Sequence, residues 1–271
     1  MKKLFCFILL FILGGIVENV AMATSIVWKG YTWNLRDDRA NSSPGYGAWS
    51  SANITGPDAN GYLTLKVTNP TGSQPIGCEM GTQKAGWGYG TYTAVVEGDM
   101  TTFDKNIVFG GLFLFYHGNP YIEFDACETS KWNGYATTQI IHNSWYGTYP
   151  SALKSHGVRM AIPSDTVQTH RLIWQEGKAT FDSFIGTGTE GTPYFHTEIT
   201  QDVPPPGSEV VVFNMWTTLG GLAGSTPGAT DLDAPETSVI LRDFTFTPLS
   251  STPTPTPTPT TKPGQRKGQK K

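Results

Sequence analysis

Short strand-like runs separated by turn residues recur between residues 25 and 248, and they constrain the fold of this chain more than any other feature. The run 62–67 alternates apolar and polar side chains, and the run 107–116 is almost entirely apolar. Similar runs occupy 91–97, 209–216 and 238–247, and no stretch keeps a 3.6-residue apolar period for three turns. The pattern predicts an all-β domain built from two packed antiparallel sheets.

The N-terminal end of the chain is not expected to belong to that domain. Two lysines at positions 2 and 3 precede an apolar run at 4–17, and the Ala-Met-Ala stretch at 21–23 has the pattern of a cleavage site. Residues 1–23 are therefore predicted to be a secretory signal peptide. The apolar run is shorter than the about 20 residues that a membrane span needs. We expect a secreted, extracellular protein with no transmembrane segment after cleavage.

The C-terminal end, residues 250–271, is predicted to be a linker and tail. Threonine and proline alternate along 252–261, which favours an extended, semi-rigid spacer. A basic cluster of Lys262, Arg266, Lys267, Lys270 and Lys271 follows. We expect this cluster to be solvated, and contact with an anionic cell surface is the alternative. The predicted folded domain is 24–249, and we expect it to be a monomer.

The net charge and the cysteine content bear on two questions, whether the protein binds nucleic acid and whether it contains a disulfide. The formal net charge is −3 and the core has no run of basic residues, so no nucleic-acid partner is expected. Cys78 and Cys127 remain once the signal peptide is removed. Disulfides persist outside the cell, but free cysteines are often simply buried. A disulfide and two buried thiols therefore both stay open.

Three carboxylates fall within the six residues from Glu123 to Glu128. Residues two apart in a strand share a face, so Glu123 and Asp125 point the same way. Glu128 points the opposite way in a regular strand. One extra residue in a β-bulge at 126–127 reverses that orientation. The spacing then predicts three carboxylates on one face with an apolar row behind them.

Such a cluster is costly, because adjacent carboxylates raise one another's pKa. Cleavage of a glycosidic bond uses this arrangement. One carboxylate attacks the anomeric carbon and a protonated carboxyl gives a proton to the leaving oxygen, with the two about 5–5.5 Å apart in retaining enzymes. Asp125, between the two glutamates, is placed to hydrogen-bond the attacking group. A calcium site or a solvated acidic face is the alternative.

The Glu-x-Asp-x-x-Glu spacing resembles the catalytic signature of glycoside hydrolase family 16 in its bulged form. Other stretches resemble segments of that family in the expected order: Glu-Met at 79–80, Gly-Tyr-Gly-Thr-Tyr at 88–92, the apolar strand at 111–116, His-Arg-Leu-Ile-Trp at 170–174 and Phe-Asn-Met-Trp at 213–216. The likeness covers residues 25 to 248, which is essentially the whole predicted domain.

The resemblance implies a β-sandwich jelly roll of two curved antiparallel sheets, concanavalin A-like, with a polysaccharide cleft on its concave face. It implies Glu123 as nucleophile, Asp125 as its assistant and Glu128 as acid/base. The bulged form is typical of laminarinase-like and agarase-like members, which favours a retaining endo-β-glycosidase acting on a β-1,3-(1,4-)glucan without a cofactor. A non-catalytic, lectin-like glucan-binding module and a transglycosylase are the alternatives. Asp243 stands where many members bind a structural calcium ion.

Aromatic side chains after the motif are the candidate sugar contacts. Sugars stack their C–H faces on flat rings, and we expect Trp132, Trp145 and Trp216 to contact the substrate. His142 is expected to hydrogen-bond a sugar hydroxyl or a catalytic carboxylate. Core packing is the alternative for all four. The tryptophan that many family members carry in the strand before the motif is missing, since 112–115 reads Leu-Phe-Leu-Phe. Another stacking platform is therefore expected.

Overall fold

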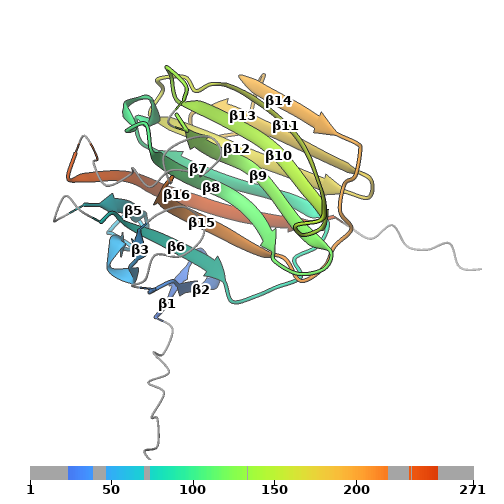
Figure 1. Cartoon of the computed structure of the whole chain (residues 1–271), viewed down its shortest axis with the longest axis horizontal. Coiled ribbons are helices and arrows are strands. Elements are labelled where there is room, and N and C mark those ends of the chain that lie inside the picture. The colour runs from blue at the N-terminus through green and yellow to red at the C-terminus, as the bar shows by residue number, and fades with distance from the viewer. Residues whose placement is uncertain are drawn as a thin grey trace, which may run out of the picture.

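The computed structural model describes residues 24–38, 47–69, 74–132, 134–218, 232 and 234–249. The predicted signal peptide and the predicted tail lie outside the described residues. Within the described part of the chain there are sixteen β-strands and two short 3₁₀ helices (Figure 1). None of the described residues forms a helix that is long and apolar enough to cross a membrane.

In chain order the elements are β1 (Ser25–Trp28), β2 (Tyr31–Leu35), β3 (Ala48–Trp49), η1 (Ser51–Asn53), β4 (Ile54–Thr55), β5 (Leu63–Thr68), β6 (Ile76–Thr82), β7 (Gly90–Glu97), η2 (Met100–Thr102), β8 (Ile107–Tyr116), β9 (Tyr121–Ser130), β10 (Gln139–Thr148), β11 (Ala152–Ala161), β12 (Val167–Gln175), β13 (Lys178–Ile185), β14 (Phe195–Ile199), β15 (Val210–Thr217) and β16 (Glu236–Pro248). The strand-like runs of the sequence match β5, β7, β8, β15 and β16 to within two residues at each end.

The strands form two layers. The first layer has the order β11-β10-β9-β8-β15-β6, and the second has the order β5-β16-β7-β12-β13-β14. The layers are continuous where Thr68 of β5 pairs with Ile76 of β6. Neighbouring strands along this path are antiparallel, whereas the short β3 runs parallel to β6. The predicted all-β architecture is confirmed, with the difference that the two sheets are joined through β6 into one curved sheet.

Aromatic side chains between the layers hold the carboxylate strand against the second layer. Phe124 of β9 points inward, and its ring centroid lies 5.0 Å from that of Trp174 in β12 and 6.2 Å from that of Phe181 in β13. All three side chains are completely or almost completely buried. Because buried aromatic groups dominate core energetics, this cluster fixes the position of β9 from behind.

The two cysteines of the domain are separate, buried thiols. Cys78 lies in β6 and Cys127 in β9, and neither forms a disulfide. Burial raises the pKa of the Cys78 thiol to about 12 and also raises the pKa of the Cys127 thiol. Both therefore stay protonated at neutral pH and serve as small apolar groups.

Candidate active site

A bulge in β9 sets the direction of the three carboxylates. On either side of it Asp125 and Glu128 pair with β10, but the two residues 126–127 oppose a single β10 residue, His142. The bulge predicted from the Glu-x-Asp-x-x-Glu spacing is therefore present. Because the extra residue restores the phase of the strand, Glu123, Asp125 and Glu128 all face the same cleft.

The neighbouring strand β8 carries a matching extra residue. Gly111 and Leu112 together oppose Phe213 of β15, so β8 is also bulged against its other neighbour. Pairing between β8 and β9 stays in step across the two bulges. A side chain does not fit at position 111, since its Cβ would lie 2.4 Å from the Phe109 ring and 3.0 Å from Cys127 Sγ. Glycine therefore permits the close packing that the paired bulges require.

Residues that pair across strands point to the same face, so the register defines three rows across the first layer. Each row has one carboxylate at its centre. The rows are Arg159–Ile141–Glu128–Gly110–Asn214–Glu79, Gly157–Asn143–Asp125–Phe113–Val212 and Ser155–Trp145–Glu123–Phe115–Val210. The site is therefore assembled by strand register, with contributions from five or six strands in each row.

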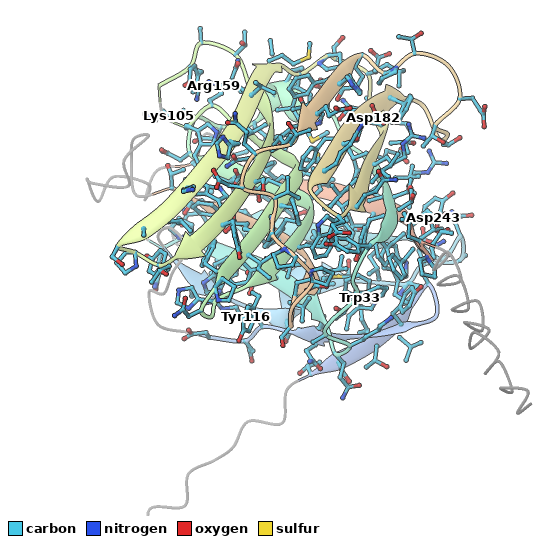
Figure 2. The ribbon with its side chains drawn as sticks, turned by 90° about the vertical axis from the view of Figure 1, so that its right-hand side faces the viewer. Trp33, Lys105, Tyr116, Arg159, Asp182 and Asp243 are labelled. Atoms are coloured by element: carbon cyan, nitrogen blue, oxygen red, sulfur yellow. The ribbon has the colours of Figure 1, made fainter. Side chains whose placement is uncertain are left out.

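The face of the first layer that carries these rows is hollowed into an open cleft of about 1220 Å³. Figure 2 shows the two layers side by side, with Arg159 of β11 on the cleft-bearing layer and Asp182 on the other. Phe113 and Phe115 of β8 also line the cleft. They supply aromatic surface on the strand where the family's tryptophan is missing. Alternation along β8 places Phe113 and Phe115 on one face, but it is their pairing with Asp125 and Glu123 that makes this the cleft face, and strand pairing is not visible in the sequence.

The electrostatic environment separates the roles of the two outer carboxylates. Burial, with the nearby charge of Glu123, raises the pKa of Glu128 to about 8. Burial also raises the pKa of Glu123. Hydrogen bonds from Tyr121 and Asp125 and the charge of His117 oppose that rise. Glu128 therefore keeps its proton at neutral pH, whereas Glu123, whose pKa is also raised, has hydrogen-bond partners and a nearby charge that favour its anion.

Asp125 lies between the two glutamates and acts on Glu123. Burial, followed by the charges of Glu123 and Glu128, raises the pKa of Asp125 well above its usual range. The Asp125 and Glu123 side chains share a hydrogen bond that favours the Glu123 anion, and the Trp145 side chain hydrogen-bonds Asp125 in turn. The sequence assigned Asp125 the role of assisting a nucleophile, and that role stays a prediction. Two glutamates with different proton affinities and a shared neighbour form a pair suited to acid-assisted nucleophilic attack.

Three of the four predicted sugar contacts line the cleft. Trp145 stands beside Glu123, and Trp132 and Trp216 pack edge to face with ring centroids 6.0 Å apart. The Trp132 indole Nε1 is buried without a hydrogen-bond partner among the described residues. All three rings line the cleft, and their contact with a sugar stays a prediction.

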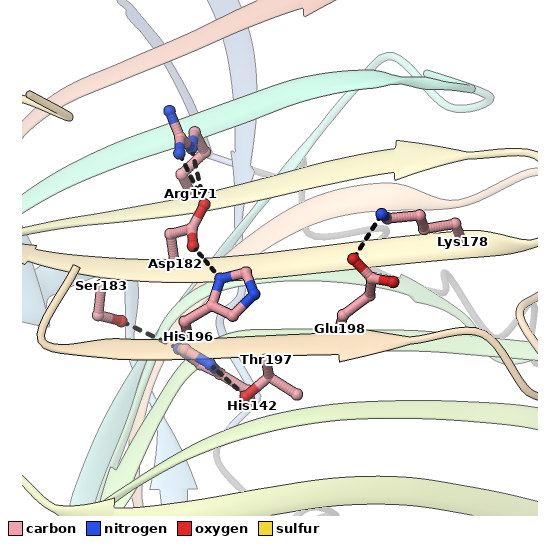
Figure 3. Close-up of polar contacts among 8 residues, drawn as sticks. All are labelled: His142, Arg171, Lys178, Asp182, Ser183, His196, Thr197 and Glu198. Atoms are coloured by element: carbon pink, nitrogen blue, oxygen red, sulfur yellow. Dashed lines mark hydrogen bonds and ion pairs between the residues drawn. The ribbon is translucent and has the colours of Figure 1, made fainter. Parts of the chain in front are cut away.

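The fourth predicted contact, His142, lies on the opposite side of β10 and not in the cleft. Its Nδ1 is 3.1 Å from Thr197 Oγ1 and its Nε2 is 3.0 Å from Ser183 Oγ (Figure 3). The ring stacks on Phe195 at 3.9 Å, and burial lowers its pKa well below the usual range. The expectation that His142 contacts substrate is wrong, because the alternation that brings Trp145 to the cleft turns His142 inward.

Asp243 lies in β16, on the second layer (Figure 2). The cation against its carboxylate is the Lys29 ammonium, with Nζ 3.2 Å from Oδ1. Among the described residues, no group of three or more His, Cys, Asp or Glu side chains is arranged to hold a metal ion. Calcium binding at Asp243 stays a prediction from the resemblance.

A polar group at one edge of the cleft was not among the predicted site residues. Glu79 accepts hydrogen bonds from Arg36 Nη1 at 3.3 Å and from Asn214 Nδ2 at 3.1 Å. Asn214 reaches this position because Gly110 leaves room: a Cβ on Gly110 would lie 2.5 Å from Asn214 Oδ1. The sequence showed Glu79 and Asn214 only as parts of resembling segments. Their pairing depends on β6 and β15 being neighbours, which the sequence does not reveal.

No family model matches the sequence, and no curated protein matches it. Solved structures do match the fold. A glycoside hydrolase family 16 endo-glucanase from Bacteroides ovatus superposes with a TM-score of 0.63 at 13% identity, over 79% of this chain and 94% of that one. A β-glucanase from Bacillus licheniformis gives 0.57 at 18% identity, over 79% and 91%.

A third match is Rv0315 of Mycobacterium tuberculosis, described as an immunostimulatory antigen and pseudo β-1,3-glucanase. It gives a TM-score of 0.57 at 17% identity over 78% of this chain and 88% of that one. The chain therefore has the jelly-roll fold of glycoside hydrolase family 16, as its motifs predicted. Since one structure with this fold is called a pseudo-glucanase, the fold by itself does not decide between catalysis and binding.

Proposed function

We propose that this chain is a retaining endo-β-glycosidase that hydrolyses a β-linked glucan, with Glu123 as nucleophile and Glu128 as acid/base. The observation that carries the proposal is that two carboxyl groups on one wall of the cleft differ in how strongly their surroundings favour the protonated form. The pKa of Glu128 is raised to about 8, so this group keeps its proton at neutral pH, whereas Glu123 has hydrogen-bond donors that favour its anion. Glycosidic cleavage with retention needs one group of each kind.

The reaction proceeds in two steps. Glu128 gives its proton to the glycosidic oxygen as that bond breaks, and the Glu123 carboxylate bonds to the anomeric carbon. Glu128, now ionised, then takes a proton from water, and the resulting hydroxide displaces Glu123 from the sugar. Asp125 supports the first step by donating a hydrogen bond to Glu123. Every proton is returned, so no cofactor is required.

The shape of the cleft, the bulged motif and the N-terminal sequence support the endo mode of attack, the substrate class and secretion, in that order. The cleft is open and has aromatic side chains on both sides of the carboxylates, which suits attack within a long chain. The bulged motif favours a β-1,3-(1,4-)glucan, and the structures with the same fold include an endo-glucanase and a β-glucanase. Secretion rests on the pattern of residues 1–23 alone. A transglycosylase forms the same intermediate and differs only in the acceptor of the second step.

The test is release of reducing sugar by the purified domain, residues 24–249, from laminarin, lichenan, xyloglucan, agarose and carrageenan. We expect release from laminarin or lichenan, and none from the matched Glu123→Gln variant. A pull-down on insoluble glucan runs in parallel. Binding of glucan without any release would instead support the non-catalytic module.

We expect kcat/KM to follow a bell-shaped pH profile with its alkaline limb near pH 8. Glu128 must be protonated to act, so activity is lost as the pH rises through its pKa of about 8. Glu123 must be ionised, and its raised pKa places the acid limb above the ordinary range of glutamate. Initial rates on soluble glucan from pH 4 to pH 10 measure both limbs. A rate that keeps rising to pH 10 would contradict the assignment of Glu128.

A further inference from the structure

We propose that Tyr121 is a positioning residue that holds the carboxylate of Glu123 for attack. The inference rests on the proposed function and adds a residue that neither the motif nor the chemistry of paired carboxylates requires. Tyr121 stands two residues before Glu123 on β9, so the two side chains share the cleft face. Its hydroxyl donates a hydrogen bond to Glu123 Oε2.

The Tyr121 ring is held in place by its neighbours. Tyr149 stacks on it with ring centroids 5.5 Å apart and planes at 21°. Phe115 meets it edge-on at 5.6 Å, and the His117 ring lies 5.8 Å away in a similar orientation. Tyr121 is 8% exposed, so its hydroxyl has little freedom to leave Glu123 for water. A donor fixed in this way restricts rotation of the carboxylate it contacts.

Tyr121 also favours the ionised form of Glu123 before it attacks the sugar. Burial and the adjacent Glu123 charge raise the pKa of the Tyr121 phenol, so it does not lose its proton in the working pH range. A hydrogen bond to the charged form of a carboxyl lowers that carboxyl's pKa. The hydrogen bond from Tyr121 therefore lowers the pKa of Glu123, whereas burial raises it.

The other groups that face Glu123 differ from Tyr121 in charge or in their part in the reaction. On its own strand lie Asp125 and Glu128, which are carboxyl groups whose pKa values depend on the charge of Glu123. The segments after β8 and β10 present His117 and Tyr149. The β8 and β10 residues paired with Glu123, Phe115 and Trp145, carry no charge. Tyr121 is therefore a donor to Glu123 whose own protonation the reaction does not change.

The test is the pH profile of Tyr121→Phe, which removes the hydroxyl and keeps the ring. The Glu123 pKa should rise, so we expect the acid limb of kcat/KM to move to higher pH by about one unit. At the low-pH end kcat/KM then falls about tenfold, with a small change in KM. Tyr149→Phe is the matched control: it removes a hydroxyl from the stacked ring, and its acid limb should stay in place whatever its KM.

Acid limbs that superimpose for wild type and Tyr121→Phe would overturn the inference, as would an equal displacement in Tyr149→Phe. The failure of the proposed function is distinguishable, because it appears as wild-type activity in Glu123→Gln. A second readout does not need turnover. Tyr121→Phe should lower the unfolding temperature increasingly as the pH rises and Glu123 ionises, and this pH-dependent loss should vanish in a Glu123→Gln background. A loss that is the same in both backgrounds would contradict the proposal.

Discussion

Glu123→Gln and Glu128→Gln are each expected to lower kcat on a glucan by on the order of 10⁴-fold or more. Glu123→Gln removes the nucleophile and leaves an amide that cannot form the glycosyl intermediate. Glu128→Gln removes the proton that the leaving oxygen takes up. Glutamine has nearly the same size, so the rows of side chains across the cleft stay filled. Release of reducing sugar from the glucan that the wild type cleaves measures both losses.

The two variants should differ when the leaving group needs no proton. On an aryl glucoside with an acidic phenol, Glu128→Gln should recover much of the rate of bond cleavage, because general acid assistance is no longer needed. Glu123→Gln should stay inactive on both substrates. Equal recovery by both variants, or wild-type rates in either, would contradict the assigned roles.

Folding stability provides a check that the losses are chemical. The folded-state pKa of Glu128 is raised to about 8, so the native state binds its proton more tightly than the unfolded state does. Its contribution to stability is therefore present at low pH and is lost as the pH rises toward 8. Glu128→Gln should be at least as stable as wild type at pH 8, as thermal unfolding can show. A large loss of stability at that pH would mean that the variant is inactive for structural reasons.

Phe124→Ala is expected to lower the free energy of unfolding by about 3–5 kcal/mol. Its ring is completely buried between β9 and the second layer, against Trp174 and Phe181. Truncation leaves a cavity that these rings cannot fill without moving the strand that carries the carboxylates. The lost free energy corresponds to a fall in Tm of roughly 6–20 °C for a domain of this size. Urea denaturation followed by tryptophan fluorescence measures it.

Phe113→Ala is the matched control for Phe124→Ala. Phe113 belongs to β8 and lines the cleft, so its truncation opens space to solvent and leaves no interior cavity. We expect a smaller loss of stability and a larger effect on KM. If both variants lost the same free energy of unfolding, Phe124 would not be the residue that anchors β9.

The sequence predicted what depends on local spacing. The all-β fold class follows from the alternating runs, and the bulge at 126–127 follows from the sequence spacing between Asp125 and Glu128. His142 shows where local reasoning was incomplete. Trp145 and His142 are three residues apart on β10, which carries no extra residue between them, so the two side chains point to opposite faces. The alternation rule that was applied to the carboxylates also excludes His142 as a sugar contact.

The remaining features depend on which strands are neighbours. Glu79 and Asn214 are hydrogen-bonded across β6 and β15, although 135 positions separate them in the chain. The stacking of Tyr149 on Tyr121 requires the turn after β10 to return beside the start of β9. Neither contact leaves a periodic signal, because loop closure and strand order are properties of the whole fold.

The paired bulges of β8 and β9 make the permitted lengths of these two strands interdependent. Deleting one residue from 126–127 alone would regularise β9 against β10 but put it out of step with β8. Deleting one residue from 111–112 alone would create the mirror-image mismatch. Removal of one residue from each strand would restore regular pairing on all three boundaries. It would leave a Glu-x-Asp-x-Glu spacing with its carboxylates still on one face. Insertions and deletions in this part of the chain should therefore be tolerated only in coupled pairs, so that a shortened variant needs two events and passes through a misregistered intermediate.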